Sequence, residues 1–277
     1  MNIVSKRPKW WLDFVAFIWP LTWLSGRIYN LPILGTLLKY ISLPLFSKKR
    51  QNLTYIPINE GISGTGSTYL PREIVAELIK KASNRAIIHH CTCRLDRSCK
   101  EHPTDYGCML MGDGAAEIGP NIAKQVTVEQ ALSHLDAVLK DGLIPLVGRA
   151  PIDNLIYGVS FKGKLLTICF CCRCCCTILK SGKYLPDEIH ESIVPLEGMK
   201  IVTVYEKCTL CEICVGECFM GALSVVDGKL VRDDVRCKAC GRCITVCPEG
   251  ANEAIVEDPE FAISGIMERI RGFVDFE

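Results

Sequence analysis

Residues 208–218 read CTLCEICVGEC, and residues 237–248 read CKACGRCITVCP. Both stretches contain four cysteines with the same spacing, Cys-x2-Cys-x2-Cys-x3-Cys. This spacing allows three thiolates of one loop to hold a cubane iron–sulfur cluster, while the fourth cysteine reaches a second cluster. The repeat therefore predicts two clusters, electron-transfer chemistry and a reducing compartment. Two structural zinc sites are the alternative, but zinc sites do not usually repeat this spacing.

The two cysteine runs resemble those of bacterial-type ferredoxins that carry two 4Fe–4S clusters, and the resemblance covers residues 200–257. Phe219 stands where that family usually has proline, and Glu212 stands where it usually has glycine, but neither departure removes a ligand. The resemblance implies that each cluster takes three ligands from one run and one from the other. Cluster one would be held by Cys208, Cys211, Cys214 and Cys247, and cluster two by Cys237, Cys240, Cys243 and Cys218.

The charge of the chain is unevenly distributed. The net charge of the 277 residues is +1, although the first fifty residues carry a clear basic excess with Asp13 as their one acid. The remainder is therefore acidic, which suits docking to a basic electron-transfer partner. Nucleic acid is not an expected partner, because the basic residues lie in an apolar segment without interleaved stacking aromatics on a polar face. Eighteen cysteines in this spacing fit a reducing cytoplasm and suggest an anaerobic host.

Residues 1–50 contain two apolar stretches flanked by basic residues, and the first stretch holds all four tryptophans. Neither stretch predicts a clean transmembrane helix, because the first is short and contains Asp13, and the second is interrupted by Pro32, Gly35, Lys39 and Pro44. Tryptophan favours the lipid headgroup region, and lysine and arginine favour anionic lipid. We expect a peripheral or monotopic anchor on the cytoplasmic face of the cell membrane. A helical arm packed on a partner subunit is the alternative.

The whole chain predicts an α+β protein, in which a small α/β middle domain with cysteine-rich segments precedes the ferredoxin-like dicluster module. A helix is expected over Val128–Lys140, with Thr127 and Gln130 forming a capping box. A strand is expected at Leu165–Ile168, leading directly into a run of cysteines. The expected units are an anchor at 1–50, a linker at 51–70, the middle domain at 71–180, a connector at 181–199, the dicluster module at 200–257 and a C-terminal helix at 258–277.

The middle domain carries ten further cysteines in two segments. Burying so many thiols gains little over valine or leucine, and exposed neighbouring thiols oxidise readily, so metal ligation is the better interpretation. We predict one or two additional iron–sulfur clusters between the segments, with a zinc site or a redox dithiol as alternatives. The expected ligands are Cys93, Cys99 and Cys108 with Cys91 behind them, and Cys171, Cys172, Cys174 and Cys175. Their division among clusters stays open.

These two segments, Cys-x-Cys-Arg and Cys-Cys-x-Cys-Cys-Cys, are similar to those of a broad set of anaerobe iron–sulfur proteins, over residues 70–257. That resemblance implies no particular activity. Arg94 and Arg173 each lie inside a cysteine run, where a guanidinium offsets thiolate charge, donates to cluster sulfur or binds an anionic substrate. We therefore name both as candidate catalytic residues, with an ordinary surface ion pair as the alternative.

Two functions follow from these features. The first is a membrane-associated electron-transfer protein that relays low-potential electrons through the two C-terminal clusters to further clusters in the middle domain. The second is an iron–sulfur reductase whose middle-domain cluster reduces a disulfide, a quinone or a lipid double bond. No flavin, nicotinamide or nucleotide motif is present in the sequence, so electrons would be exchanged with a redox protein, which in the first case serves a membrane enzyme.

Overall fold

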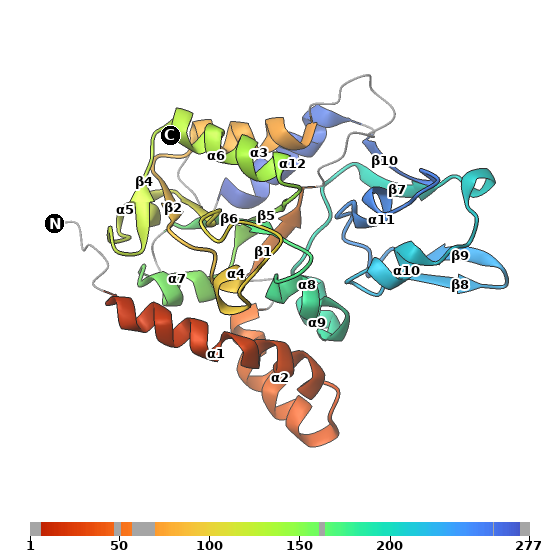
Figure 1. The fold of residues 1–277 in the computed structure, drawn as a ribbon, viewed down its shortest axis with the longest axis horizontal. Helices are drawn as coiled ribbons and strands as arrows, with labels where there is room; N and C mark the ends of the chain where they lie inside the picture. The colour runs from red at the N-terminus through yellow and green to blue at the C-terminus, as the bar shows by residue number, and fades with distance from the viewer. Residues whose placement is uncertain (1–6, 47–50, 57–69, 161–163, 257, 272–277) are drawn as a thin grey trace.

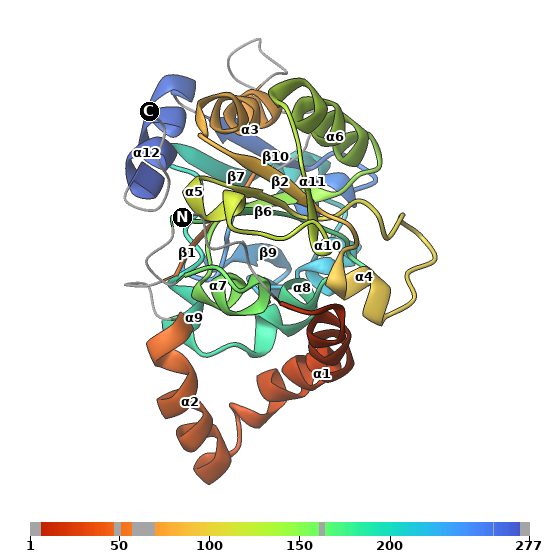
Figure 2. The same cartoon turned by 90° about the vertical axis from the view of Figure 1, so that its left-hand side faces the viewer.

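A computed structural model describes residues 7–46, 51–56, 70–160, 164–256 and 258–271 (Figure 1). The described chain is an α+β fold. A sheet with helices on both faces forms the body, a smaller cysteine-rich module extends from one end of it, and the N-terminal helices lie beneath it (Figures 1 and 2). The basic residues Lys6, Lys48, Lys49 and Arg50 lie outside the described residues.

Within the described residues the body contains a six-stranded sheet of order β1-β5-β6-β3-β2-β4. All of its paired strands run antiparallel, so the expected α/β middle domain is corrected to α+β. β6 lies between β5 and β3 and continues directly into the second cysteine segment. The strands are β1 Asn52–Tyr55, β2 Arg85–Ile88, β3 Met109–Met111, β4 Ala123–Gln125, β5 Ile144–Arg149 and β6 Leu166–Cys171.

β1 also corrects the predicted linker at 51–70. Asn52–Tyr55 pairs with β5, and Leu53 and Tyr55 are buried, so this segment belongs to the sheet. The glycine and serine residues that suggested a linker lie at 57–69, outside the described residues. In the expected connector at 181–199, Gly182–Tyr184 forms a 3-10 turn and Asp187–His190 forms α9, so this segment has helical turns of its own.

The upper face of the sheet in Figure 1 is covered by α3 (Leu70–Lys81), α6 (Val128–Lys140) and α12 (Pro259–Arg271). The predicted capping box at the start of α6 is confirmed, because Thr127 and Gln130 exchange both side chain to backbone hydrogen bonds. The expected C-terminal helix is present over Pro259–Arg271, and its Ile266 and Ile270 pack into the same core as α3 and α6, while residues 272–277 lie outside the described residues. The three helices and the upper face of the sheet therefore share one buried apolar core.

The lower face of the sheet carries short helices beside the cysteine segments (Figure 1). These helices are α4 Thr92–Asp96, α5 Asp113–Ala116, α7 Pro151–Tyr157 and α8 Thr177–Ser181. Cys91 precedes the first turn of α4, and Cys176 precedes the first turn of α8. Helix starts therefore place Cys91 of the first segment and Cys176 of the second on the lower side of the sheet.

The N-terminal segment forms two helices, α1 (Lys9–Ile28) and α2 (Pro32–Phe46), which Figure 2 shows beneath the body. α1 contacts α4 and α8, and Val15 is buried in a core that also contains residues of β2 and β3. Large apolar side chains elsewhere on both helices are exposed, among them Phe17 at 81% and Ile33 at 83%. No helix in the described part of the chain is both long enough and apolar enough to span a bilayer.

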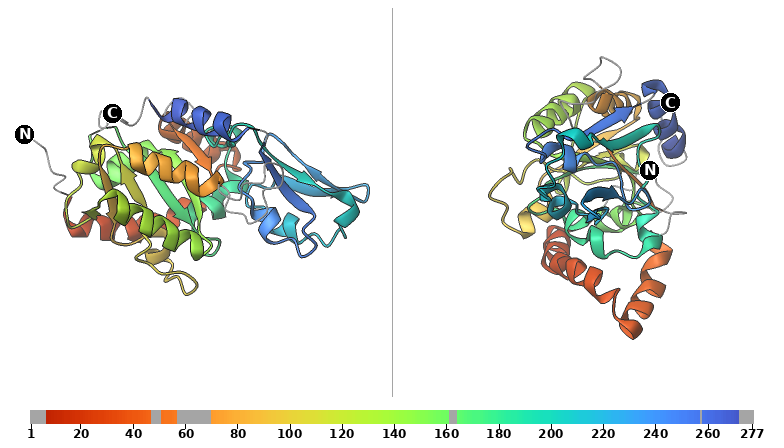
Figure 3. Two further views of the ribbon diagram at one scale, coloured as in Figure 1. Left: turned by 90° about the horizontal axis from the view of Figure 1, so that it is seen from above. Right: turned by 90° about the vertical axis from the view of Figure 1, so that its right-hand side faces the viewer.

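The C-terminal module lies at one end of the body, as the view from above in Figure 3 shows. It contains two antiparallel strand pairs with short helical turns between them. One pair is β7 (Met199–Thr203) with β10 (Asn252–Val256), and the other is β8 (Leu223–Val226) with β9 (Lys229–Arg232). The helical turns are η2 Tyr205–Lys207, α10 Ile213–Glu217 and α11 Arg242–Thr245.

Candidate metal centres

The two cysteine loops of the C-terminal module have matching backbone conformations. Glu212 and Gly241 precede α10 and α11 and both adopt left-handed conformations, with φ of 58° and 79°. Glu212 replaces the usual glycine but keeps the left-handed backbone conformation that Gly241 has in the second loop. This conformation is less favourable for a residue with a side chain than for glycine. The fourth cysteines also match, because the amides of Ala222 and Ala251 donate to the sulfur atoms of Cys218 and Cys247 at 3.3 and 3.2 Å.

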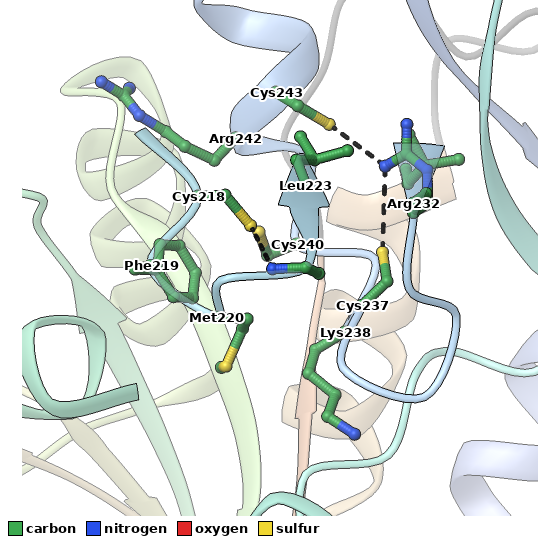
Figure 4. A pocket seen from close by; sticks show the side chains of 13 residues that line it. Cys218, Phe219, Met220, Leu223, Arg232, Cys237, Lys238, Cys240, Arg242 and Cys243 are labelled. Atoms are coloured by element: carbon green, nitrogen blue, oxygen red, sulfur yellow. Dashed lines mark hydrogen bonds between the residues drawn. The ribbon is translucent and has the colours of Figure 1, made fainter. Parts of the chain in front are cut away.

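The structure brings the four cysteines expected for cluster two around one pocket (Figure 4). Arg232 lies beside this pocket and donates to Cys243 Sγ at 3.6 Å and to Cys237 Sγ at 3.9 Å. Its other nitrogen donates to Thr203 and Asn252, which fixes the guanidinium against the sulfurs. The pocket is lined by Cys218, Cys237, Cys240 and Cys243. A set of thiolates with a fixed cation fits a cluster whose core carries negative charge.

The four cysteines expected for cluster one also lie together. Burial raises the pKa of Cys214, and the charges of Cys247, Cys208 and Cys211 act in the same direction. Cys247 comes from the second run, so the crossing of ligands that the family resemblance implies is compatible with this fold. Cys211 is exposed, which makes this loop the more accessible side of the module.

In the middle domain, Cys99 meets three cysteines of the second segment. The sulfur atoms of this group all lie within 4.8 Å of one another, and Cys99 Sγ and Cys174 Sγ are 3.4 Å apart. The group, which we call the four-thiol site, consists of Cys99, Cys172, Cys174 and Cys175. The sequence predicted all four as ligands, and the structure separates them from the other predicted ligands of the middle domain, Cys91, Cys93, Cys108 and Cys171.

Those other cysteines lie with two more around a cavity of about 460 Å³. Cys108 precedes β3 and stands opposite Cys169 of β6, and their sulfur atoms are 3.5 Å apart. Cys91 hydrogen-bonds with Cys108 and Cys93, and Cys93 hydrogen-bonds with Cys176. The group, which we call the thiol ring, consists of Cys91, Cys93, Cys108, Cys169, Cys171 and Cys176. Cys172 of the four-thiol site also lines the cavity, so the two groups are neighbours.

Sequence reasoning missed Cys169 and Cys176 as members of this group. The alternation of β6 could have revealed the first, since Thr167, Cys169 and Cys171 all line the cavity, whereas Leu166 and Ile168 pack in the upper core. No local pattern indicates Cys176, because its place depends on the turn at 172–176 that returns the chain to the cavity.

The cavity lies between the thiol ring and the two N-terminal helices. Trp11, Val15 and Ile18 of α1 line it, as do Leu38 and Phe46 of α2. These side chains make one wall of the cavity apolar. A metal centre at the thiol ring would therefore face an apolar space with few competing water molecules.

Two residues with exchangeable protons also line the cavity. Tyr157 of α7 is buried there, and Asp153 of the same helix is partly buried. Asp153 Oδ2 accepts a hydrogen bond from Thr167 Oγ1 at 2.6 Å, and burial raises the pKa of Asp153 to about 6. No local sequence pattern indicates either residue.

The two candidate arginines have different surroundings. Arg94 is fully buried, donates to the carbonyl oxygens of Phe170 and Tyr106, and hydrogen-bonds with Cys172. It lies between the four-thiol site and the thiol ring, which fits a cation that offsets thiolate charge. Arg173 is mostly exposed, pairs with Glu217 and is not among the residues that line the cavity. The ion-pair alternative therefore describes Arg173 better than a catalytic role.

Comparison with known families bears on the C-terminal module. Residues 196–251 match the family model described as a 4Fe-4S dicluster domain. A search of curated proteins and a search of solved structures each found no match. The matched residues contain all eight cysteines of the two runs, so the prediction of a ferredoxin-like C-terminal module is confirmed.

The 4Fe-4S dicluster domain and the cysteine clusters together indicate iron–sulfur electron transfer. The dicluster family model supports this function, and the four-thiol site adds a further place for metal in the middle domain. Clusters of this type carry single electrons, and their potentials depend on net charge, hydrogen bonds to sulfur and solvent exposure.

Arg232 provides a test of the cluster-two pocket. We expect Arg232→Gln to lower the reduction potential of one C-terminal cluster by about 40 mV, or about 1 kcal/mol for one electron, because a cation near sulfur favours the reduced state. Potentiometric titration followed by EPR measures this shift. Lys229→Gln is the matched control, since Lys229 is exposed on the same strand. Equal potentials in the two variants would contradict the assignment.

Proposed function

We propose that the protein relays low-potential electrons from a redox protein through its two C-terminal clusters to metal centres in the middle domain. One observation carries this proposal. Tyr55 is completely buried between the module and the thiol ring, and nearby charges of Cys171, Cys176 and Cys240 add to burial in raising its pKa. Cysteines of the C-terminal module and of the thiol ring therefore both lie near the side chain of Tyr55.

The packing around Tyr55 supports a short route between the regions. Its ring lies 5.6 Å from the ring of Phe219, measured between centroids, and Phe219 lines the pocket of cluster two. Met220 and Ala222 of the module share a buried core with Tyr55 and Cys171. This contact is buried, so cluster two is the candidate for the inner cluster. Cluster one, with the exposed Cys211, is the candidate for the site where electrons enter.

The first experiment removes cluster one. We expect Cys211→Ala to slow reduction of the middle-domain centre by a reduced ferredoxin at least about tenfold, because the accessible entry site is lost. Dithionite, a small reductant, should still reduce the centre. Stopped-flow spectroscopy on the anaerobic full-length protein measures both rates. Thr209→Ala in the same loop is the control. Unchanged reduction by ferredoxin in Cys211→Ala would contradict the relay.

The cavity favours a second function, that of a reductase. Its apolar wall, together with the protons of Asp153 and Tyr157, suits an uncharged substrate that takes up electrons and protons together. A disulfide, a quinone and a lipid double bond each need two electrons and two protons. In this proposal the ferredoxin-type clusters deliver the electrons singly, and groups at the cavity, re-protonated from solvent, supply the protons.

A cavity-filling variant separates the two functions. Ile18→Trp should block the cavity and lower turnover of a short-chain quinone or a dialkyl disulfide at least about tenfold if the protein is a reductase. Phe17→Trp is the control, because Phe17 is exposed on the opposite side of α1. Both variants should keep their iron content. If the protein reduces neither substrate, or if Ile18→Trp leaves turnover unchanged, the cavity is not the site of reduction.

We further propose that α1 and α2 bind the cytoplasmic surface of the cell membrane. The proposal rests on the exposed apolar side chains of both helices, including Phe17, Ile33 and Tyr40, each more than 80% exposed. The exposed Arg27 lies close to this apolar surface and suits anionic headgroups. Because Trp11 and Ile18 point to the cavity on the other side of α1, bound lipid would lie near the cavity.

Vesicle binding tests this arrangement. The double variant Phe17→Asp with Ile33→Asp should reduce co-sedimentation with anionic vesicles at least about tenfold, because each apolar side chain contributes about 2 kcal/mol of burial. Val235→Asp is the control, since Val235 is 77% exposed on the C-terminal module. If the wild-type chain, the double variant and Val235→Asp bind the vesicles equally weakly or equally strongly, the membrane proposal is contradicted. That result would favour a protein partner at these helices.

A further inference from the structure

The ten cysteines of the middle domain divide into two groups with different geometry. In the four-thiol site every sulfur atom lies within 4.8 Å of every other. Among the described residues, no three sulfur atoms of the thiol ring meet this criterion, although successive members contact one another. The first group is therefore compact, and the second is open.

We infer that the thiol ring binds a polynuclear iron–sulfur cluster of its own, and that the four-thiol site binds a single metal ion. This inference deepens the proposed function, on which it rests for the source of electrons, by naming the ligands of two different middle-domain centres. The ligands of the polynuclear cluster come from Cys91, Cys93, Cys108, Cys169, Cys171 and Cys176.

Sulfur spacing supports the single ion at the four-thiol site. Four thiolates around one metal at about 2.3 Å stand about 3.8 Å apart in a tetrahedron. The 3.4 Å between Cys99 Sγ and Cys174 Sγ and the 4.8 Å limit for the whole group agree with that spacing. A cubane core separates its four ligands more widely, because each thiolate binds a different iron atom.

The C-terminal module provides an internal comparison. Its eight cysteines, for which the dicluster family model implies two cubanes, form no such compact group among the described residues. In this respect the thiol ring resembles the module rather than the four-thiol site. The open spacing of the ring therefore fits several metal atoms bridged by sulfide.

The chain path explains why the ring stays open. Cys169 and Cys171 occupy alternate positions on one face of β6, which fixes their separation, and Cys108 is held opposite Cys169 by the pairing of β3 with β6. Cys91 and Cys176 are held just before α4 and α8. Rigid elements therefore hold the thiols around the cavity instead of letting them converge on one point.

The space and charge around the ring also fit a cluster. All six ring cysteines line a cavity of about 460 Å³, whereas Cys172 is the one member of the four-thiol site that lines it. Arg94 is the buried cation on this lining in the described chain, and it reaches Cys91 and Cys108 electrostatically. When metal displaces the protons of these thiols, Arg94 balances part of the resulting thiolate charge and the metal balances the rest.

The metal and sulfide content of the anaerobically purified full-length protein tests the inference. The wild-type chain should hold more than the eight iron atoms and eight acid-labile sulfides of two cubane clusters, together with one further iron or zinc ion. Cys169→Ser should leave the eight irons and eight sulfides of the two cubanes together with the single iron or zinc ion, and remove all other iron and sulfide. Cys174→Ser is the matched variant of the other group, and it should remove one ion without any sulfide.

Three results would overturn the inference. The first is about eight irons and eight sulfides in the wild-type chain. The second is loss of sulfide from Cys174→Ser with none from Cys169→Ser. The third is a disulfide between ring cysteines in the native protein, detected by mass spectrometry after alkylation. If the serine variants do not fold, native mass spectrometry of the wild-type chain decides, because the mass bound beyond two cubanes must contain sulfide.

Failure of this inference is distinguishable from failure of the relay. One outcome is that the extra iron and sulfide are present, but a reduced ferredoxin does not reduce the middle-domain cluster through the C-terminal clusters. In that case the proposed function is wrong and the ligand assignment stands. If no extra sulfide is present while the C-terminal clusters still exchange electrons with a ferredoxin, the ligand assignment is wrong and the dicluster module keeps its function.

Discussion

The position of β6 between β5 and β3 is the constraint on which the middle-domain centres depend. Successive side chains of a strand point to opposite faces, so Cys169 and Cys171 share the cavity face while Ile168 packs into the upper core. The chain then turns at 172–176 and sends Cys172, Cys174 and Cys175 to Cys99. β6 and the turn after it therefore divide the cysteines of the second segment between the thiol ring and the four-thiol site.

Two arginines near the sulfur atoms are held firmly. Arg232 is fixed by Thr203 and Asn252 against two cysteines of the cluster-two pocket. Arg94 is fixed by two backbone carbonyl groups between the two thiol groups of the middle domain. Each arginine is thus preorganised, which lowers the cost of placing negative charge beside it. Both are positioned by tertiary contacts rather than by their sequence neighbours alone.

The N-terminal helices line the cavity of the thiol ring on one face and are exposed on another. α1 has an inner face, with Trp11, Val15 and Ile18 at the cavity, and an outer face that includes Phe17. An anchor that only touched lipid would need no inner face. The proposed membrane contact and the proposed reductase site would therefore share one helix, and an apolar substrate could reach the cavity from the lipid side without crossing water.

The sequence by itself determined the dicluster module, because its ligands lie in two short loops whose spacing is read directly from the chain. It also determined α6, since the cap formed by Thr127 and Gln130 is local. It did not determine that Asn52–Tyr55 joins the sheet or that Cys99 separates from Cys93. Those outcomes depend on strand pairing and on contacts between residues more than seventy positions apart, such as Cys99 with Cys174. Only the tertiary structure decides such contacts, because no local preference of a thiol specifies which distant thiol it meets.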